Sequence, residues 1–219
     1  MVTTMDRVIF DMDGIIFDSE RLFMRELTEV LSEHGYEMTE DKYVQTLGLT
    51  GKALEKKVKS LFGEDYPHLE MSRITRNRVN DIAFCGGLPV KKGIKELLEY
   101  LKSKNISCAV ASSTHSPYVE KYLETSGLRK YFDTVIGGEM AERSKPEPDI
   151  FLMALGNVKS ENALVLEDST NGILAAHRAN IPVICIPDMV YPTDEVKMLT
   201  TAVLDNAADV ISWLESRED

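Results

Sequence analysis

Residues 8–14 read Val-Ile-Phe-Asp-Met-Asp-Gly, and this stretch decides the fold. The apolar run Val8–Phe10 stops at Asp11, and Asp13 and Gly14 follow. Continuous apolar runs are typical of parallel strands that are buried on both faces. Ligands of open parallel sheets bind beyond the carboxyl ends of the strands. Asp11 is therefore a candidate site residue, and the alternative is that it caps a turn or a helix.

Two later apolar runs also end in polar residues. Ile106–Ala111 leads into Ser112. Ala163–Leu166 leads into Glu167 and Asp168. Because the carboxyl ends of parallel strands share one edge of the sheet, these groups are expected to meet there. Taken singly, the serine is an ordinary strand-end hydroxyl, and the acidic pair can simply cap the helix that follows.

These segments, with a lysine in a loop between them, resemble the four motifs of the haloacid dehalogenase-like (HAD) superfamily of phosphotransferases. The matching residues in chain order are Asp11-Met12-Asp13-Gly14, Ser112, Lys145 with Pro146, and Glu167-Asp168. An isolated lysine is usually a surface residue, and one aspartate pair is weak evidence. All four motifs in the expected order form a specific signal, and the resemblance covers nearly the whole chain.

The pattern along the chain changes twice. Residues 19–84 carry helical stripes of apolar residues and no strand signal, and this is too long for an ordinary crossover. From residue 85 onward, helix and strand patterns alternate, which is typical of βαβ units. The sequence predicts an α/β fold with a Rossmann-like parallel sheet core, residues 1–18 and 85–219, and helices on both of its faces. Residues 19–84 are predicted to form a small α-helical cap domain, with residues 85–89 as the return hinge.

Composition limits the partners of this 219-residue chain. No apolar run approaches the about 20 residues of a membrane span, and residues 1–7 lack the pattern of a signal peptide. Three scattered cysteines indicate free thiols, so a cytoplasmic protein without a membrane partner is expected. A net charge of −11 disfavours nucleic acid, and the lysines of residues 52–59 are interpreted as a solvated helix face. The superfamily resemblance implies a small phosphate ester as the substrate, and we expect a monomer.

The superfamily resemblance implies a phosphatase that forms a covalent aspartyl-phosphate. Asp11 is the expected nucleophile, and Asp13 is the expected general acid and then general base. The expected phosphate-binding residues are Ser112, Ser113 and Lys145. The expected cofactor is Mg²⁺, which prefers oxygen ligands and few carboxylates. Its expected ligands are Asp11, Asp168, the backbone carbonyl of Asp13, and Glu167 either directly or through a second shell.

The helical insertion resembles the cap of β-phosphoglucomutase-like phosphatases, which closes over the core and contacts the leaving group. Mutases of this branch carry a histidine on the first cap helix and an arginine in a cap loop, where this chain has Phe23 and Gly51. The candidate substrate and cap residues are Phe23, Thr50, Lys52, which could replace the arginine, and His115. The missing histidine favours a phosphatase acting on a sugar phosphate or similar metabolite. A sugar-phosphate mutase is the first alternative, and a non-catalytic regulatory or binding module on the same fold is the second.

Overall fold

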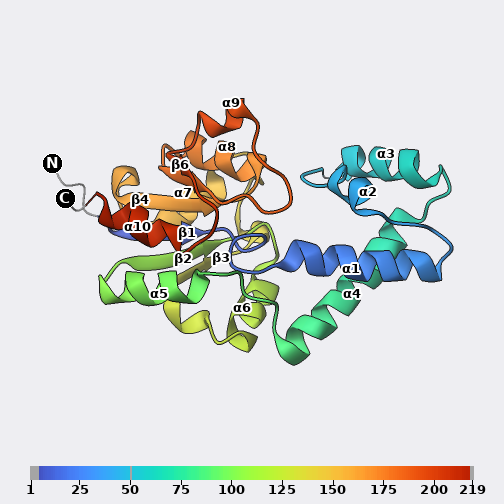
Figure 1. The fold of residues 1–219 in the computed structure, drawn as a ribbon, viewed down its shortest axis with the longest axis horizontal. Coiled ribbons are helices and arrows are strands. Elements are labelled where there is room, and N and C mark those ends of the chain that lie inside the picture. Colours follow the sequence, from blue (N-terminus) through green and yellow to red (C-terminus); the bar gives the residue numbers. More distant parts are fainter. Residues whose placement is uncertain (1–4, 50, 218–219) are drawn as a thin grey trace. The chain divides into compact units, whose positions relative to one another are not determined.

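A computed structural model describes residues 5–49 and 51–217 of the chain (Figure 1). The chain divides into two compact units. One unit is Ser19–Gly87, and the other combines the residues up to Asp18 with those from Leu88 onward. Each unit has its own secondary structure and is described separately below.

The unit that contains both ends of the chain is built on a six-stranded sheet, in the order β3-β2-β1-β4-β5-β6. All neighbouring strands are parallel. The strands are β1 (Arg7–Phe10), β2 (Ser107–Ala111), β3 (Thr134–Ile136), β4 (Ala163–Glu167), β5 (Val183–Cys185) and β6 (Ala202–Val203). In register, Phe10 lies opposite Val110 of β2 and Leu166 of β4. The three strands that precede the motif residues are therefore adjacent, with β1 in the middle.

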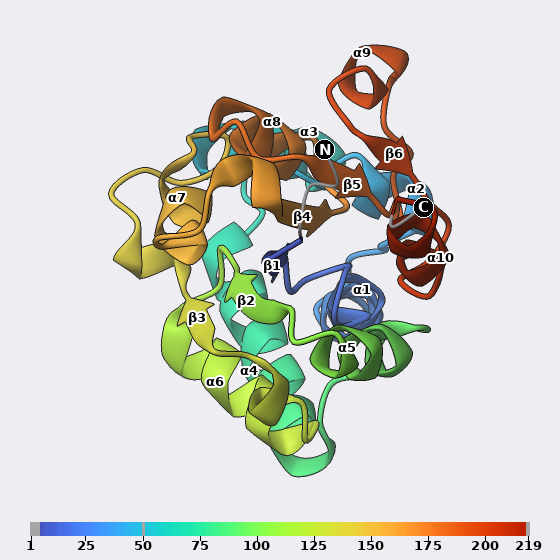
Figure 2. The same ribbon diagram turned by 90° about the vertical axis from the view of Figure 1, so that its left-hand side faces the viewer.

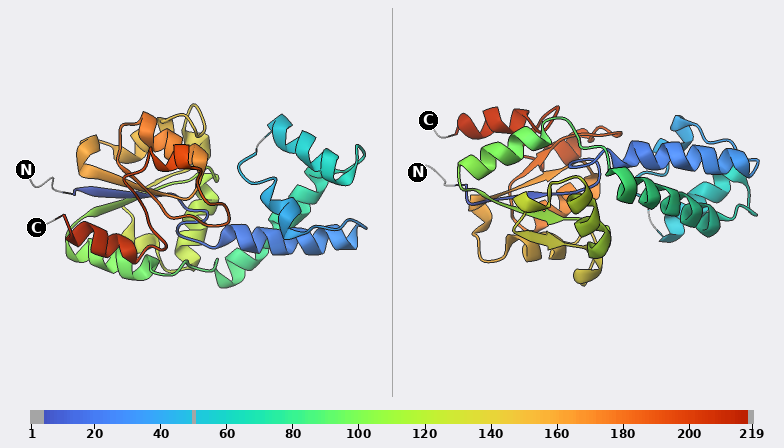
Figure 3. Two further views of the ribbon diagram at one scale, coloured as in Figure 1. Left: turned by 45° about the horizontal axis from the view of Figure 1, so that its top comes forward. Right: turned by 90° about the horizontal axis from the view of Figure 1, so that it is seen from below.

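Helices cover both faces of this sheet, as predicted (Figure 2). The α7 and α8 helices pack on one face, whereas α5 and α6 pack on the other. The α10 helix lies beside α5 (Figure 3). The bounds are α5 (Ile94–Ser103), α6 (Ser116–Thr125), α7 (Asp149–Leu155), α8 (Thr170–Arg178), α9 (Asp194–Lys197) and α10 (Asp209–Glu215), with short 3-10 turns η1 (Arg129–Tyr131), η2 (Gly138–Met140) and η3 (Ser160–Asn162). The predicted α/β fold of the core is confirmed.

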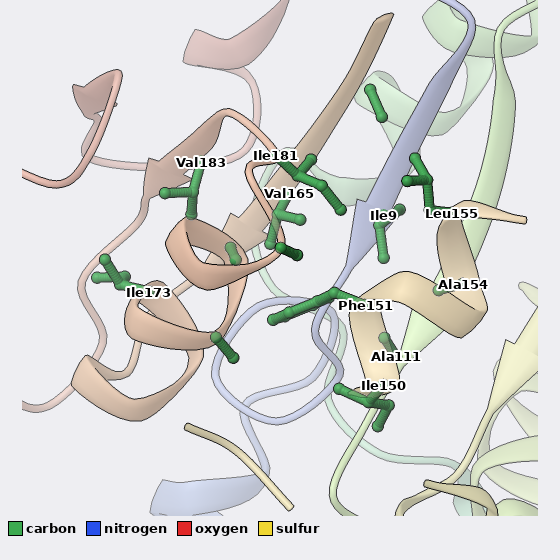
Figure 4. Close-up of a cluster of buried hydrophobic side chains, with 14 of the residues drawn as sticks. Ile9, Ala111, Ile150, Phe151, Ala154, Leu155, Val165, Ile173, Ile181 and Val183 are labelled. Carbon is green, nitrogen blue, oxygen red and sulfur yellow. The ribbon is translucent and has the colours of Figure 1, made fainter. Parts of the chain in front are cut away.

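Apolar side chains from the strands and helices form the core on the α7–α8 face (Figure 4). Phe151 of α7 and Ile173 of α8 are fully buried, as are Ile9 of β1 and Val165 of β4. Burying one such side chain contributes about 1.5–3 kcal/mol through the hydrophobic effect. The central strand β1 is thus packed firmly on this face, which fixes the position of Asp11, the residue that follows it.

A short antiparallel ribbon holds the two segments of the core unit that lead to and from the Ser19–Gly87 unit. Asp18 N donates to Pro89 O at 2.8 Å, and Lys91 N donates to Ile16 O at 2.9 Å. The Nζ atom of Lys91 also lies 2.6 Å from Oδ1 of Asp188, just beyond β5. The two segments that lead to and from the Ser19–Gly87 unit are therefore held at the carboxyl edge of the sheet.

The Ser19–Gly87 unit is helical, and α1 packs along α4 within it. Its helices are α1 (Ser19–Glu33), α2 (Glu40–Val44), α3 (Gly51–Phe62) and α4 (His68–Gly86). Leu31 of α1 and Met71 of α4 are buried in this unit. Because α4 continues to Gly86, the first two residues of the predicted hinge are helical. Among the described residues, no helix combines the length and the apolar character needed to cross a membrane.

Candidate active site

Three motif residues from distant parts of the chain meet at the carboxyl edge of the sheet. Nζ of Lys145 lies 2.5 Å from Oδ1 of Asp11 and 2.7 Å from Oε1 of Glu167. It also donates to the backbone carbonyl of Ala111, at the end of β2, over 3.2 Å. The lysine side chain is 6% exposed. The loop between β3 and α7 thus delivers a buried ammonium group to the ends of three neighbouring strands.

Burial raises the pKa of Asp11 to about 8, and the charges of Glu167 and Asp13 act in the same direction against the opposing charge of Lys145. Burial alone lowers the pKa of Lys145, but the charges of Asp11 and Glu167 and their hydrogen bonds with the ammonium group together outweigh it, so the net shift is upward. Lys145 is therefore charged at neutral pH. The ionised form of Asp11 is therefore stabilised by nearby positive charge, which Lys145 provides and to which a bound cation would add.

Glu167 is turned back into the beginning of α8 and is 1% exposed. Its Oε2 accepts hydrogen bonds from Asp168 N at 2.9 Å, Ser169 N at 2.8 Å and Ser169 Oγ at 3.0 Å. Ser169 also caps α8, because its Oγ accepts from Gly172 N at 3.0 Å. Both carboxylate oxygens of Glu167 are thus engaged by protein donors, one by Lys145 and one by the start of the helix.

Gly172 is a site residue that the sequence motifs did not identify. A Cβ atom at this position would lie 1.6 Å from Oε1 of Glu167, so the carboxylate occupies space that any larger residue needs. The sequence carries a signal for this close approach: an acidic pair ends the strand, and a glycine lies in the first turn of the helix that follows.

Asp168 lies against the turn that follows Asp11. A Cβ atom on Gly14 would be 2.2 Å from Oδ2 of Asp168, and Gly14 has a φ of +78°, which favours glycine. Asp11 and Asp168 thus come from the adjacent strands β1 and β4 and flank the same turn. No group of three or more His, Cys, Asp or Glu side chains is arranged to hold a metal ion within residues 5–49 and 51–217. Two carboxylates completed by carbonyl and water oxygens fit Mg²⁺, which usually keeps several waters.

The loop after β2 brings a hydroxyl to the same edge and hydrogen-bonds to the second aspartate, Asp13. Ser112 is fully buried, and its Oγ accepts a hydrogen bond from Thr114 N at 3.0 Å. Oγ1 of Thr114 donates to Oδ2 of Asp13 at 3.0 Å. Thr114 also lies outside the sequence motifs, because a threonine three residues after the end of a strand has no distinctive spacing. The loop therefore connects the candidate phosphate-binding serine to the candidate acid–base residue.

The remaining predicted site residues lie in other settings. Ser113 is exposed, and its carbonyl oxygen borders Gly138. His115 is 57% exposed, with Nδ1 4.0 Å from Oε1 of Glu139. In the helical unit, Phe23 is half-buried and Lys52 is exposed. Thr50 lies outside the described residues. Substrate contacts by these residues stay predictions.

The haloacid dehalogenase-like hydrolase family matches residues 8–186, which span the motif residues described above. The chain belongs to the haloacid dehalogenase-like hydrolases. The predicted superfamily and the prediction that the chain is an enzyme of this hydrolase class are confirmed. This hydrolase is 34% identical over 187 residues to the phosphorylated carbohydrates phosphatase of Thermotoga maritima, covering 81% of this chain and 82% of the relative.

Two solved structures extend this similarity over nearly all of the hydrolase. CbbY from Rhodobacter sphaeroides, in complex with phosphate, is 26% identical with a TM-score of 0.77 and covers 97% of this chain and 100% of that one. β-Phosphoglucomutase from Clostridium difficile is 20% identical with a TM-score of 0.74, and the similarity covers 99% of this chain and 97% of the β-phosphoglucomutase chain. The second similarity shows a shared fold alone.

Proposed function

We propose that this hydrolase is a Mg²⁺-dependent phosphatase that cleaves a small phosphorylated metabolite through an aspartyl-phosphate on Asp11. The observation that carries the proposal is the buried ammonium of Lys145, held between Asp11 and Glu167 at the edge where Ser112 also lies. Transfer of a phosphoryl group depends mainly on positioning and on neutralising charge. A fixed cation beside a buried carboxylate supplies both.

Ser112 and Lys145 bind the phosphoryl group in this proposal. Because Oγ of Ser112 already accepts from Thr114 N, its own hydroxyl hydrogen is directed elsewhere and can be donated to a phosphoryl oxygen. Lys145 acts as a point charge that pairs with the phosphate as well as with Asp11. The overall net charge of −11 repels an anionic ester, so these local donors must supply the affinity.

The reaction has two steps. In the first, a carboxylate oxygen of Asp11 forms a bond to phosphorus while the bond to the leaving oxygen breaks, and Asp13 gives its proton to that oxygen. In the second, water attacks the aspartyl-phosphate, Asp13 takes a proton from this water, and the bond between Asp11 and phosphorus breaks. Inorganic phosphate is released, and both carboxyl groups return to their starting states.

Asp11, Asp168 and the carbonyl of Asp13 are the residues that would hold Mg²⁺. When bound there, the ion supplies positive charge next to the transferring phosphoryl group. Both oxygens of Glu167 accept hydrogen bonds from the protein, so we assign Glu167 to holding Lys145 and not to direct metal binding.

The leaving group is proposed to be a sugar or a similar small metabolite, and the Ser19–Gly87 unit is proposed to act as the cap that contacts it. The Thermotoga relative, named for phosphorylated carbohydrates, supports this substrate class. The fold shared with β-phosphoglucomutase is compatible with the mutase alternative but does not favour it over a phosphatase. Phe23 weighs against the mutase, because a phenylalanine cannot transfer protons. The non-catalytic alternative is disfavoured because the chain has the expected residues in all four motifs.

A direct test follows inorganic phosphate and sugar products together. The protein is incubated with Mg²⁺ and a panel of sugar phosphates, and separately with β-glucose 1-phosphate and a trace of the bisphosphate. The proposal predicts release of phosphate, absence of this release in Asp11→Asn, and little glucose 6-phosphate. Efficient formation of glucose 6-phosphate with negligible free phosphate would support the mutase. No turnover of any ester by the wild type would support the non-catalytic module.

A further inference from the structure

We infer that Thr114 is a positioning residue that aims the carboxyl group of Asp13 at the leaving-group oxygen. The inference rests on the proposed function, because it assigns a task to Asp13 within that reaction. Thr114 does not contact the reacting phosphorus in this account, and it acts only through Asp13.

Three hydrogen bonds fix Thr114 in place. Its backbone N–H donates to Oγ of Ser112 at 3.0 Å, and its carbonyl accepts from Gly138 N at 3.0 Å. Its side-chain hydroxyl then donates to Oδ2 of Asp13 at 3.0 Å. The backbone of Thr114 is thus held from both sides, so the hydroxyl is a donor with a defined direction.

The bond matters because Asp13 is in the turn after β1 and is only half-buried. Proton transfer requires an acid within hydrogen-bond reach of the oxygen it protonates, about 2.6–3.2 Å between heavy atoms. Catalytic groups must be held within about 0.5 Å of their productive geometry by neighbours that are themselves fixed. A hydrogen bond to Oδ2 restrains the rotation of the carboxyl group and so limits the directions in which Oδ1 can point.

The same loop links two functions. Ser112 receives the Thr114 N–H, and Asp13 receives the Thr114 hydroxyl, so the phosphate-binding serine and the acid–base carboxyl share one rigid connection. A shift of the phosphoryl group and a shift of the acid are thereby coupled. This arrangement keeps the proton donor aligned with the ester oxygen that leaves.

The dependence of the rate on the leaving group distinguishes a positioning role of Thr114 from a purely structural one, which would affect all substrates alike. An alkoxide that leaves from a sugar phosphate needs the proton of Asp13 as the P–O bond breaks. The 4-nitrophenolate ion is a weaker base, so it is stable enough to leave without that proton. The value of kcat/KM reports the steps up to loss of this leaving group. Loss of the Thr114 hydroxyl should therefore reduce kcat/KM for alkyl phosphates and leave the aryl value nearly unchanged.

The experiment compares Thr114→Val with Thr114→Ser, using the best sugar phosphate found for the wild type and 4-nitrophenyl phosphate. Thr125→Val is the matched control, because the hydroxyl of Thr125 donates to the carbonyl oxygens of Lys121 and Tyr122 within α6. We expect Thr114→Val to lower the sugar-phosphate kcat/KM by about 10- to 100-fold and the aryl value by less than about 3-fold. This is a partial loss, because complete loss of general acid catalysis costs about 100- to 10,000-fold. Thr114→Ser should restore most of the sugar-phosphate rate.

An equal loss on both substrates, or no loss on either, would overturn the assignment of Thr114 while leaving the phosphatase proposal intact. Failure of Thr114→Ser to recover the rate would also overturn it. A wild-type protein that turns over neither ester would instead refute the proposed function and this inference with it. Melting temperatures of all variants identify any change that comes from loss of the fold.

Discussion

Glu167 Oε1 lies 2.7 Å from Nζ of Lys145, and the two side chains are 1% and 6% exposed. A buried ion pair is costly to desolvate and is weak evidence for stability, so positioning is the better explanation of this contact. Glu167 is anchored by the backbone that begins α8, and it fixes the lysine on the side of Asp11. The charge that binds phosphate is therefore placed by β4 and α8 as well as by its own loop.

Lys145→Met should lower kcat by at least about 100-fold, because it removes the charge beside the phosphate while keeping much of the side-chain volume. Lys95→Met, at an exposed position of α5, is the control and should keep the wild-type rate. Rates and melting curves are measured on the same samples. A folded Lys145→Met variant with an unchanged rate would show that the lysine has no part in the chemistry.

Gly172→Ala should displace Glu167 and, through it, Lys145, because the new Cβ would lie 1.6 Å from Oε1. We expect a loss of about 1–3 kcal/mol in the free energy of unfolding, as for other overpacked sites, together with at least a 10-fold loss of kcat. Gly86→Ala is the matched control, since nothing lies within 4 Å of its Cβ position at the end of α4. Equal stability and rate for the two variants would contradict the account of Glu167.

Removal of divalent metal should abolish turnover, because Asp11 and Asp168 leave an excess of negative charge beside the phosphate. Chelator-treated protein is assayed before and after Mg²⁺ is added back, with Ca²⁺ as the comparison ion of larger radius. Mg²⁺ should restore the rate, and Ca²⁺ should restore much less, since it favours a larger and looser coordination shell. Full activity of the stripped protein in excess chelator would contradict the assignment.

The buried thiols predict a pH dependence of stability. Burial raises the pKa of Cys108 and of Cys185 to about 12 each. The unfolded chain ionises these thiols from about pH 8.5, so their contribution is full below that pH and is lost as the pH rises toward 12. Each thiol should reduce the free energy of unfolding by up to about 1.4 kcal/mol per pH unit in this window. Urea unfolding from pH 7.5 to 10 measures the slope, which Cys108→Ala should lessen. An identical slope in that variant would count against this explanation.

The strands could be predicted from the sequence because buried parallel strands are short apolar runs, and the runs Val8–Phe10, Ile106–Ala111 and Ala163–Leu166 agree with β1, β2 and β4 to within one residue at each end. The α9 helix could not be predicted in this way, because its four residues carry too few apolar positions to show a helical period. The meeting of Asp11, Lys145 and Glu167 could be expected from the motifs. The roles of Gly172 and Thr114 could not, because they depend on contacts that exist only after β1, β2 and β4 are side by side.

The central claim is that Asp11 carries the phosphoryl group during turnover. The most direct measurement is acid quenching of the working enzyme with Mg²⁺ and substrate, followed by mass spectrometry of the peptide that contains residues 8–14, with Asp11→Asn as the control. The account predicts a gain of one phosphoryl group, about 80 Da, on Asp11, sensitive to hydroxylamine as an acyl phosphate should be, and absent from the control. Turnover without any phosphorylated peptide, or a phosphoryl group on a different residue, would contradict it.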